Sequence, residues 1–192
     1  MDILAYVLSL LGLVSMISAS LTKGEKMKKI LLLVFLGNAL VATSYLIDGA
    51  GINGAAACYL GALLTIINYF FESKNKAIPK WLVAVYAVAF VAVNLWVIGG
   101  VSTLVHTFGT RAFYPPVISI IACLIFILCI GQENGAKYRF WTIINMLLWC
   151  TYDVVTPAYP GLVTHGIQLV FLAVGMIMHD RKAAKAEKAE TL

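Results

Sequence analysis

The sequence predicts an all-α integral membrane protein with seven transmembrane helices. Three observations support this fold class. Of the 192 residues, 61% are hydrophobic and only 12% are charged, whereas soluble domains have about 25% charged residues. Mean hydropathy is +0.91. Long uncharged stretches alternate with short basic segments, and about 20 apolar residues cross the hydrocarbon core as a helix.

Each span is predicted from an apolar window of this kind. The seven spans run Ile3 to Ser20, Ile30 to Ile47, Gly54 to Phe71, Trp81 to Ile98, Pro116 to Ile130, Phe140 to Thr156 and Leu162 to Met178. The first lacks a basic leading region and a cleavage site, so we expect it to be retained. The third opens on a run of glycine and alanine that favours close helix packing.

Orientation follows from the basic residues, since cytoplasmic loops are rich in Lys and Arg. Thirteen of the fourteen fall in the connections after the first, third and fifth spans and in the tail, and only Arg111 lies on the opposite side. The N-terminus is therefore predicted outside and the C-terminus inside. This bias also accounts for the net charge of +5, so no nucleic-acid partner is expected.

An internal repeat appears at an offset of 107 residues. It aligns Gly24 with Gly131, Asn38 with Asn145, and Tyr45 with Tyr152. The spans then divide as three, one and three, a parallel pseudo-repeat with an axis along the membrane normal. The corresponding units are residues 1–76, a linker helix and outer loop at 77–113, residues 114–182, and a cytoplasmic tail at 183–192.

Polar side chains within the apolar spans are the candidate site residues. Asn38 and Tyr45 share one helical face of the second span, and Asn145, Trp149 and Tyr152 share one face of the sixth. Gln168 lies near the middle of the seventh span. Amides and phenols donate and accept hydrogen bonds without fixed charge, so they suit a small neutral solute. The alternative for the amides is hydrogen bonding between helices, worth about 0.6 kcal/mol each.

Asp153 and His165 lie near the outer ends of their spans. They are candidates for proton coupling or an outer gate, with solvation among the lipid headgroups as the alternative. Asn68 was expected at the inner membrane interface and Asn94 in helix packing. The four cysteines, Cys58, Cys123, Cys129 and Cys150, lack metal-like spacing, so neither a metal nor another cofactor is expected.

Three stretches carry a family resemblance: "GNALVATSYLIDGAGINGAAA", "YPPVISIIACLIFILCIGQENGAKYRFWTIINMLLWCTYD" and "GLVTHGIQLV". They resemble the YgjV-like bacterial inner-membrane proteins, distantly similar to SWEET and PnuC-type transporters. The resemblance implies a multi-pass protein of the bacterial inner membrane, with a central pocket for a small neutral solute. SWEET-like proteins place a proline in the first helix of each triplet, whereas here Pro115 and Pro116 start the fifth span and the first span has none.

The predicted function is a transporter or facilitator of a sugar, nucleoside or vitamin precursor by alternating access, and not an enzyme. Two alternatives remain open at this level. One is a membrane enzyme acting on a lipid-like substrate, for which Asp153 and His165 are the nearest candidates. The other is a non-catalytic partner subunit. The bilayer and the solute are the predicted partners, and the sequence leaves homo-oligomerisation open.

Overall fold

The computed structural model describes residues 3–24, 26–48, 52–156 and 159–180, and all of the regular structure there is helical. The α-helices are α1 (Ile3–Ser20), α2 (Met27–Asp48), α3 (Ile52–Ser73), α4 (Lys80–Val97), α5 (Val101–His106), α6 (Tyr114–Ile130), α7 (Gly135–Val155) and α8 (Tyr159–Gly175). A 3-10 turn at Arg111–Phe113 precedes α6, and a π turn at Met176–Asp180 continues α8.

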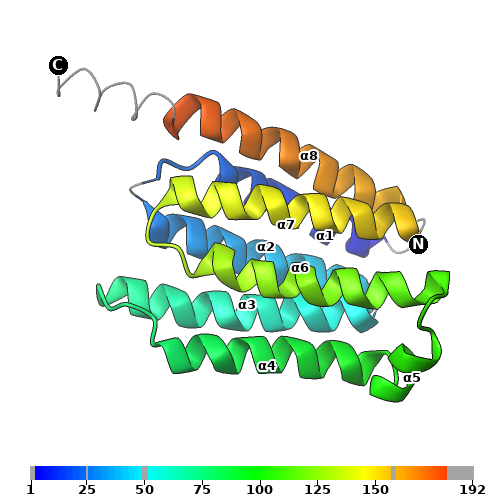
Figure 1. The fold of residues 1–192 in the computed structure, drawn as a ribbon. Helices are drawn as coiled ribbons and strands as arrows, with labels where there is room; N and C mark the ends of the chain where they lie inside the picture. The colour runs from blue at the N-terminus through cyan, green and yellow to red at the C-terminus, as the bar shows by residue number, and fades with distance from the viewer. Residues whose placement is uncertain (1–2, 25, 49–51, 157–158, 181–192) are drawn as a thin grey trace.

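The long helices lie lengthwise in one bundle (Figure 1). α2 packs between α1 and α3, and α7 packs between α6 and α8. α4 contacts α3 and α6, and α8 contacts α1. We call α1–α3 the first triplet and α6–α8 the second triplet.

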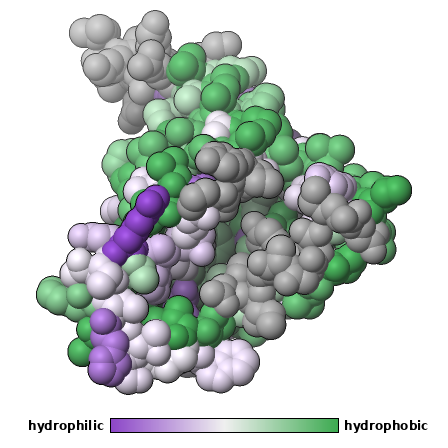
Figure 2. Space-filling model, turned by 90° about the vertical axis from the view of Figure 1, so that its right-hand side faces the viewer, coloured by the Kyte–Doolittle hydropathy of each residue, from purple (hydrophilic) through white to green (hydrophobic). Residues whose placement is uncertain are grey.

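The two ends of the bundle differ in character. The short helix α5 lies at one end, which we call the α5 end, and the opposite end carries the lysine-rich connections and is called the lysine end (Figure 1). Residues 99–113 lie at the α5 end, and most of their side chains are exposed. Figure 2 looks onto this end, where hydrophobic residues gather toward the top and right of the face and paler, more polar residues toward the left.

The outer surface of the bundle is apolar. Large hydrophobic side chains on the helix flanks are exposed, among them Leu10, Val88 and Val170, each at 60% or more. Soluble monomers rarely expose contiguous apolar patches of this extent. Six helical segments within the described residues are long and apolar enough to cross a membrane. The chain is therefore a multi-pass helical membrane protein.

Six of the seven predicted apolar spans correspond to apolar helical segments of the described residues, and α7 is the exception. The six segments include the whole of α1, which runs Ile3–Ser20 as predicted, the whole of α4 and α6, and parts of α2, α3 and α8. α7 begins at Gly135, five residues before the predicted start, because the Asn134 side chain accepts a hydrogen bond from the Lys137 backbone N–H and caps the helix. The helix thereby includes Lys137 and Arg139 as well as Asp153, which lower its hydropathy.

Candidate functional site

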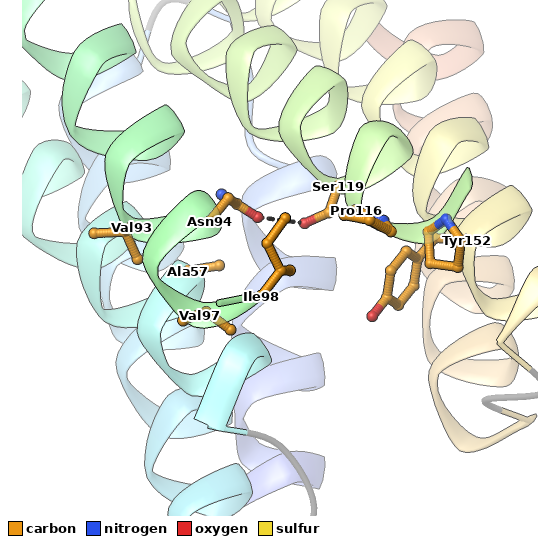
Figure 3. A pocket seen from close by; sticks show the side chains of 9 residues that line it. Ala57, Val93, Asn94, Val97, Ile98, Pro116, Ser119 and Tyr152 are labelled. Carbon is orange, nitrogen blue, oxygen red and sulfur yellow. Dashed lines mark hydrogen bonds between the residues drawn. The ribbon is translucent and has the colours of Figure 1, made fainter. Parts of the chain in front are cut away.

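A pocket of about 100 Å³ lies between the two triplets and α4. Its lining comes from α3, α4, α6 and α7: Ala57, Val93, Asn94, Val97, Ile98, Pro115, Pro116, Ser119 and Tyr152 (Figure 3). Each helix contributes residues within about two turns of its α5 end. The pocket is thus in the half of the bundle nearer α5.

Asn94 and Ser119 form the polar wall of this pocket. The Ser119 hydroxyl donates to Asn94 Oδ1 at 2.8 Å, and Asn94 Nδ2 donates to the Phe90 carbonyl at 2.9 Å (Figure 3). Pro115 and Pro116 stand in the first turn of α6, where their missing N–H groups are not needed. None of the described lining residues is charged.

Tyr152 faces the pocket from α7 and links it to an aromatic and ionic cluster. The Trp149 indole meets the Tyr152 ring edge to face at 5.4 Å between centroids and stacks on the His165 ring at 5.8 Å. His165 Nδ1 lies 2.7 Å from Asp153 Oδ2, and the Asp153 side chain is 5% exposed. The structure thus places the Asp153 carboxyl against His165 within the protein, in contrast to solvation among headgroups.

The two asparagines that the predicted repeat aligns have different surroundings. Asn145 is buried, and its Nδ2 donates to the Ala122 carbonyl of α6. Asn38 Nδ2 is also buried, yet it has no hydrogen-bond partner among the described residues. It lies beside Gly61 of α3, because a Cβ added at Gly61 would be 3.7 Å from it. Buried N–H groups almost always have partners, so the Asn38 amide is an unusual feature.

The other predicted site residues are less informative. Gln168 is buried on α8. Tyr45 belongs to α2, but its side chain lies outside the part of the chain that the structure describes. Of all the predicted site residues, Tyr152 is the one that the described pocket lining includes. Sequence reasoning missed Asn94 as a pocket residue and did not consider Ser119.

Asn68 corrects a further expectation. It is 2% exposed and not at a solvated interface. Its Nδ2 donates to the Ile130 carbonyl at 2.9 Å, and its Oδ1 accepts from the Tyr86 hydroxyl at 3.0 Å. The Ile130 carbonyl belongs to the last turn of α6, which has no partner within the helix. Asn68 therefore ties α3, α4 and α6 together near the lysine end.

Arg139 is a fully buried residue of α7 at the lysine end. Its guanidinium makes a bidentate ion pair with Asp180, with Nε 2.9 Å from Oδ2, and donates from Nη1 to the Thr22 carbonyl at 2.7 Å. Nearby, His179 Nε2 lies 3.0 Å from the Leu21 carbonyl. These contacts satisfy carbonyls at and just beyond the end of α1.

The backbones of the two triplets also meet here. The Gly135 N–H donates to the Gly24 carbonyl at 3.1 Å. A Cβ at Gly135 would come within 2.5 Å of Gly24 Cα, so only glycine allows this approach. The hydrogen bonds described above between the first and second triplets lie at the lysine end. The α5 end holds the pocket instead.

The described residues contain no group of three or more His, Cys, Asp or Glu side chains that could hold a metal ion. Comparisons of the chain with protein-family models, with curated proteins and with solved structures found no match.

Proposed function

We propose that this chain is a membrane transporter or facilitator that moves a small neutral polar solute by alternating access. The observation that carries the proposal is the pocket between the triplets, lined by the amide of Asn94, the hydroxyl of Ser119 and the ring of Tyr152. Such groups donate and accept hydrogen bonds but offer no fixed charge to an ion. Binding sites at the interface between repeats are common in transporters.

In this proposal α7 also crosses the membrane, which gives seven spans in a three-one-three pseudo-repeat. Its 21 residues would span about 31 Å, and it packs between α6 and α8. Two of its charged side chains are paired, Arg139 with Asp180 and Asp153 with His165. Charges inside membrane proteins are tolerated when they are paired and face the bundle.

The proposed orientation places the α5 end outside and the lysine end inside. The basic residues support it through the positive-inside rule. The pocket then lies on the outer side, and the hydrogen bonds between the triplets close the inner side. This arrangement corresponds to the outward-facing form of an alternating-access cycle.

Asn38 supports a binding role deeper in the bundle. Asn38 lies near the middle of the 22-residue α2, so its amide is close to the middle of the bundle along the helix axis. A buried N–H without a protein partner costs about 1–3 kcal/mol. A solute hydroxyl or carbonyl that accepts from Asn38 Nδ2 would remove this cost, and we propose that it does so.

In this proposal the remaining candidate residues gate the path or hold the helices together. Tyr152 gates the outer side, and the Asp153–His165 pair forms the gate or couples protons to it. Trp149 orients His165 by stacking. Asn145 holds α7 to α6 through the Ala122 carbonyl and is a packing residue. The YgjV-like resemblance, which implies a location in the bacterial inner membrane, fits this transport role. In it the solute crosses the membrane without chemical change.

The test is counterflow uptake into proteoliposomes with labelled glycerol, ribose, glucose, uridine and sucrose. We expect saturable uptake of at least one of them by the wild type. Asn94→Ala and Ser119→Ala should each lower it about tenfold, which corresponds to about 1.4 kcal/mol of lost hydrogen bonding.

Ser18→Ala is the matched control, because the Ser18 hydroxyl bonds only locally to the Val14 carbonyl on an exposed flank of α1. Its uptake should equal that of the wild type. Absence of saturable uptake for every solute by folded wild-type protein would contradict the proposed function.

A further inference from the structure

Three of the four helices that line the pocket, α3, α4 and α6, continue their pocket-facing stripes toward the lysine end. On α3 this stripe passes from Ala57 to Gly61 and on to Asn68. These residues are four and then seven positions apart, so they share one face of the helix. From Ala57 to Asn68 the stripe descends about 16 Å, at about 1.5 Å per residue.

The stripes on α4 and α6 follow the same descent. On α4, Asn94 is followed inward by Phe90 and Tyr86, at steps of four. On α6, Ser119 is followed by Phe126 and Ile130, at steps of seven and four. The upper members line the pocket, and the lowest members are joined by the Asn68 hydrogen bonds to Ile130 and Tyr86.

Between these two levels lies a layer that we call the aromatic layer, made of Gly61, Phe90 and Phe126. The rings of Phe90 and Phe126 meet edge to face at 6.2 Å between centroids. Phe126 also reaches α3, because a Cβ at Gly61 would be 3.3 Å from Phe126 Cε1. The unpartnered Asn38 amide nitrogen borders the same layer. The aromatic layer therefore lies one to two helical turns from the pocket lining toward the lysine end, with a hydrogen-bond donor beside it.

We propose that the aromatic layer is the size filter of the transport path, with Gly61 and Phe126 setting the largest solute that passes. The inference rests on the proposed transport function. In this proposal a solute leaving the pocket toward Asn38 passes the Phe126 ring beside Gly61, where α3 carries no side chain. Beyond this layer, the Asn68 hydrogen bonds form the inner seal.

The size-filter proposal predicts that two substitutions shift the size limit in opposite directions. Gly61→Ala adds a methyl group 3.3 Å from the ring and narrows the layer. Phe126→Ala removes the ring and widens it. With the five labelled solutes above, Gly61→Ala should slow the largest solute carried by the wild type at least tenfold relative to the smallest. Phe126→Ala should admit the next larger solute that the wild type excludes.

Matched controls separate size selection from general damage. Gly166→Ala adds the same methyl group where no heavy atom lies within 4 Å, and Phe140→Ala removes a ring that is 53% exposed. Both controls should keep the wild-type size limit. Phe126→Leu, which retains more volume, provides a milder widening if the alanine variant does not fold.

The outcomes distinguish the two proposals. Opposite shifts of the size limit in the Gly61 and Phe126 variants support the filter. Uptake that changes by one factor for all solutes, or not at all, overturns the filter while transport stands. Absence of uptake by the wild type overturns the transport function and the filter with it.

Discussion

Asn38 and Asn145 occupy equivalent positions in the repeat predicted from the sequence but have different hydrogen-bond environments. Asn145 donates to Ala122 and serves helix packing, while the Asn38 amide nitrogen has no described partner. An asparagine within an apolar span must face protein, and this much follows from sequence. Whether its hydrogen bonds are already satisfied depends on the neighbouring helix, and a single sequence contains no such information.

Leucine substitutions should separate these two asparagines. Asn145→Leu loses the hydrogen bond to Ala122 and should lower the free energy of unfolding by about 1 kcal/mol. Asn38→Leu removes a buried N–H without a partner and should raise it by about 1 kcal/mol while abolishing uptake. Unfolding in detergent micelles, followed by tryptophan fluorescence, measures both. Changes of the same sign would contradict the assignment of different roles.

Buried polar residues near the lysine end were harder to predict than those at mid-membrane. Arg139 falls among residues that the positive-inside rule assigns to a solvated loop, yet it is fully buried. Its partner Asp180 is 41 positions away. The sequence shows the charges and predicts their side of the membrane, but pairing of this kind depends on how α7 and α8 meet.

At the scale of the element, the ion pair of Arg139 should stabilise the ends of α7 and α8. Arg139→Met keeps much of the side-chain volume but leaves Asp180 and the Thr22 carbonyl without their donor. We expect a loss of about 2 kcal/mol in the free energy of unfolding, measured by the same fluorescence method. Lys137→Met changes an exposed residue two positions away and should cost less than about 0.5 kcal/mol. Equal losses in the two variants would show that the buried ion pair adds nothing to the free energy of unfolding.

Helix positions were largely predictable because apolar windows are the strongest signal in such a sequence. α1 begins and ends at the predicted residues. The start of α7 was missed since a hydropathy window stops at charged residues, whereas the helix starts at its cap, Asn134. The polar wall of the pocket escaped prediction for another reason. Asn94 and Ser119 lie on different helices, and their meeting is a product of packing.

At the scale of the whole molecule, the proposed orientation, with the pocket on the outer side, predicts one-sided access to the pocket. In a variant without the native cysteines, Ala57→Cys should react with a membrane-impermeant maleimide added outside and not inside. Asn68→Cys should react from neither side, because the inner seal buries it. Intact and inverted vesicles provide the two directions. Labelling of Ala57→Cys from the inside alone would reverse the proposed orientation.

The composition of α7 has a consequence for biogenesis. Arginine and aspartate at the centre of a span each oppose insertion by about 2.5–3.5 kcal/mol, and this penalty falls toward the ends, where Arg139 and Asp153 lie. During synthesis α7 emerges before His165 and Asp180, the residues that pair with its charges. The translocon therefore receives a weakly hydrophobic segment with unpaired charges. In the proposed seven-span topology, stable insertion of α7 awaits α8, and the last two helices enter the bilayer as a hairpin.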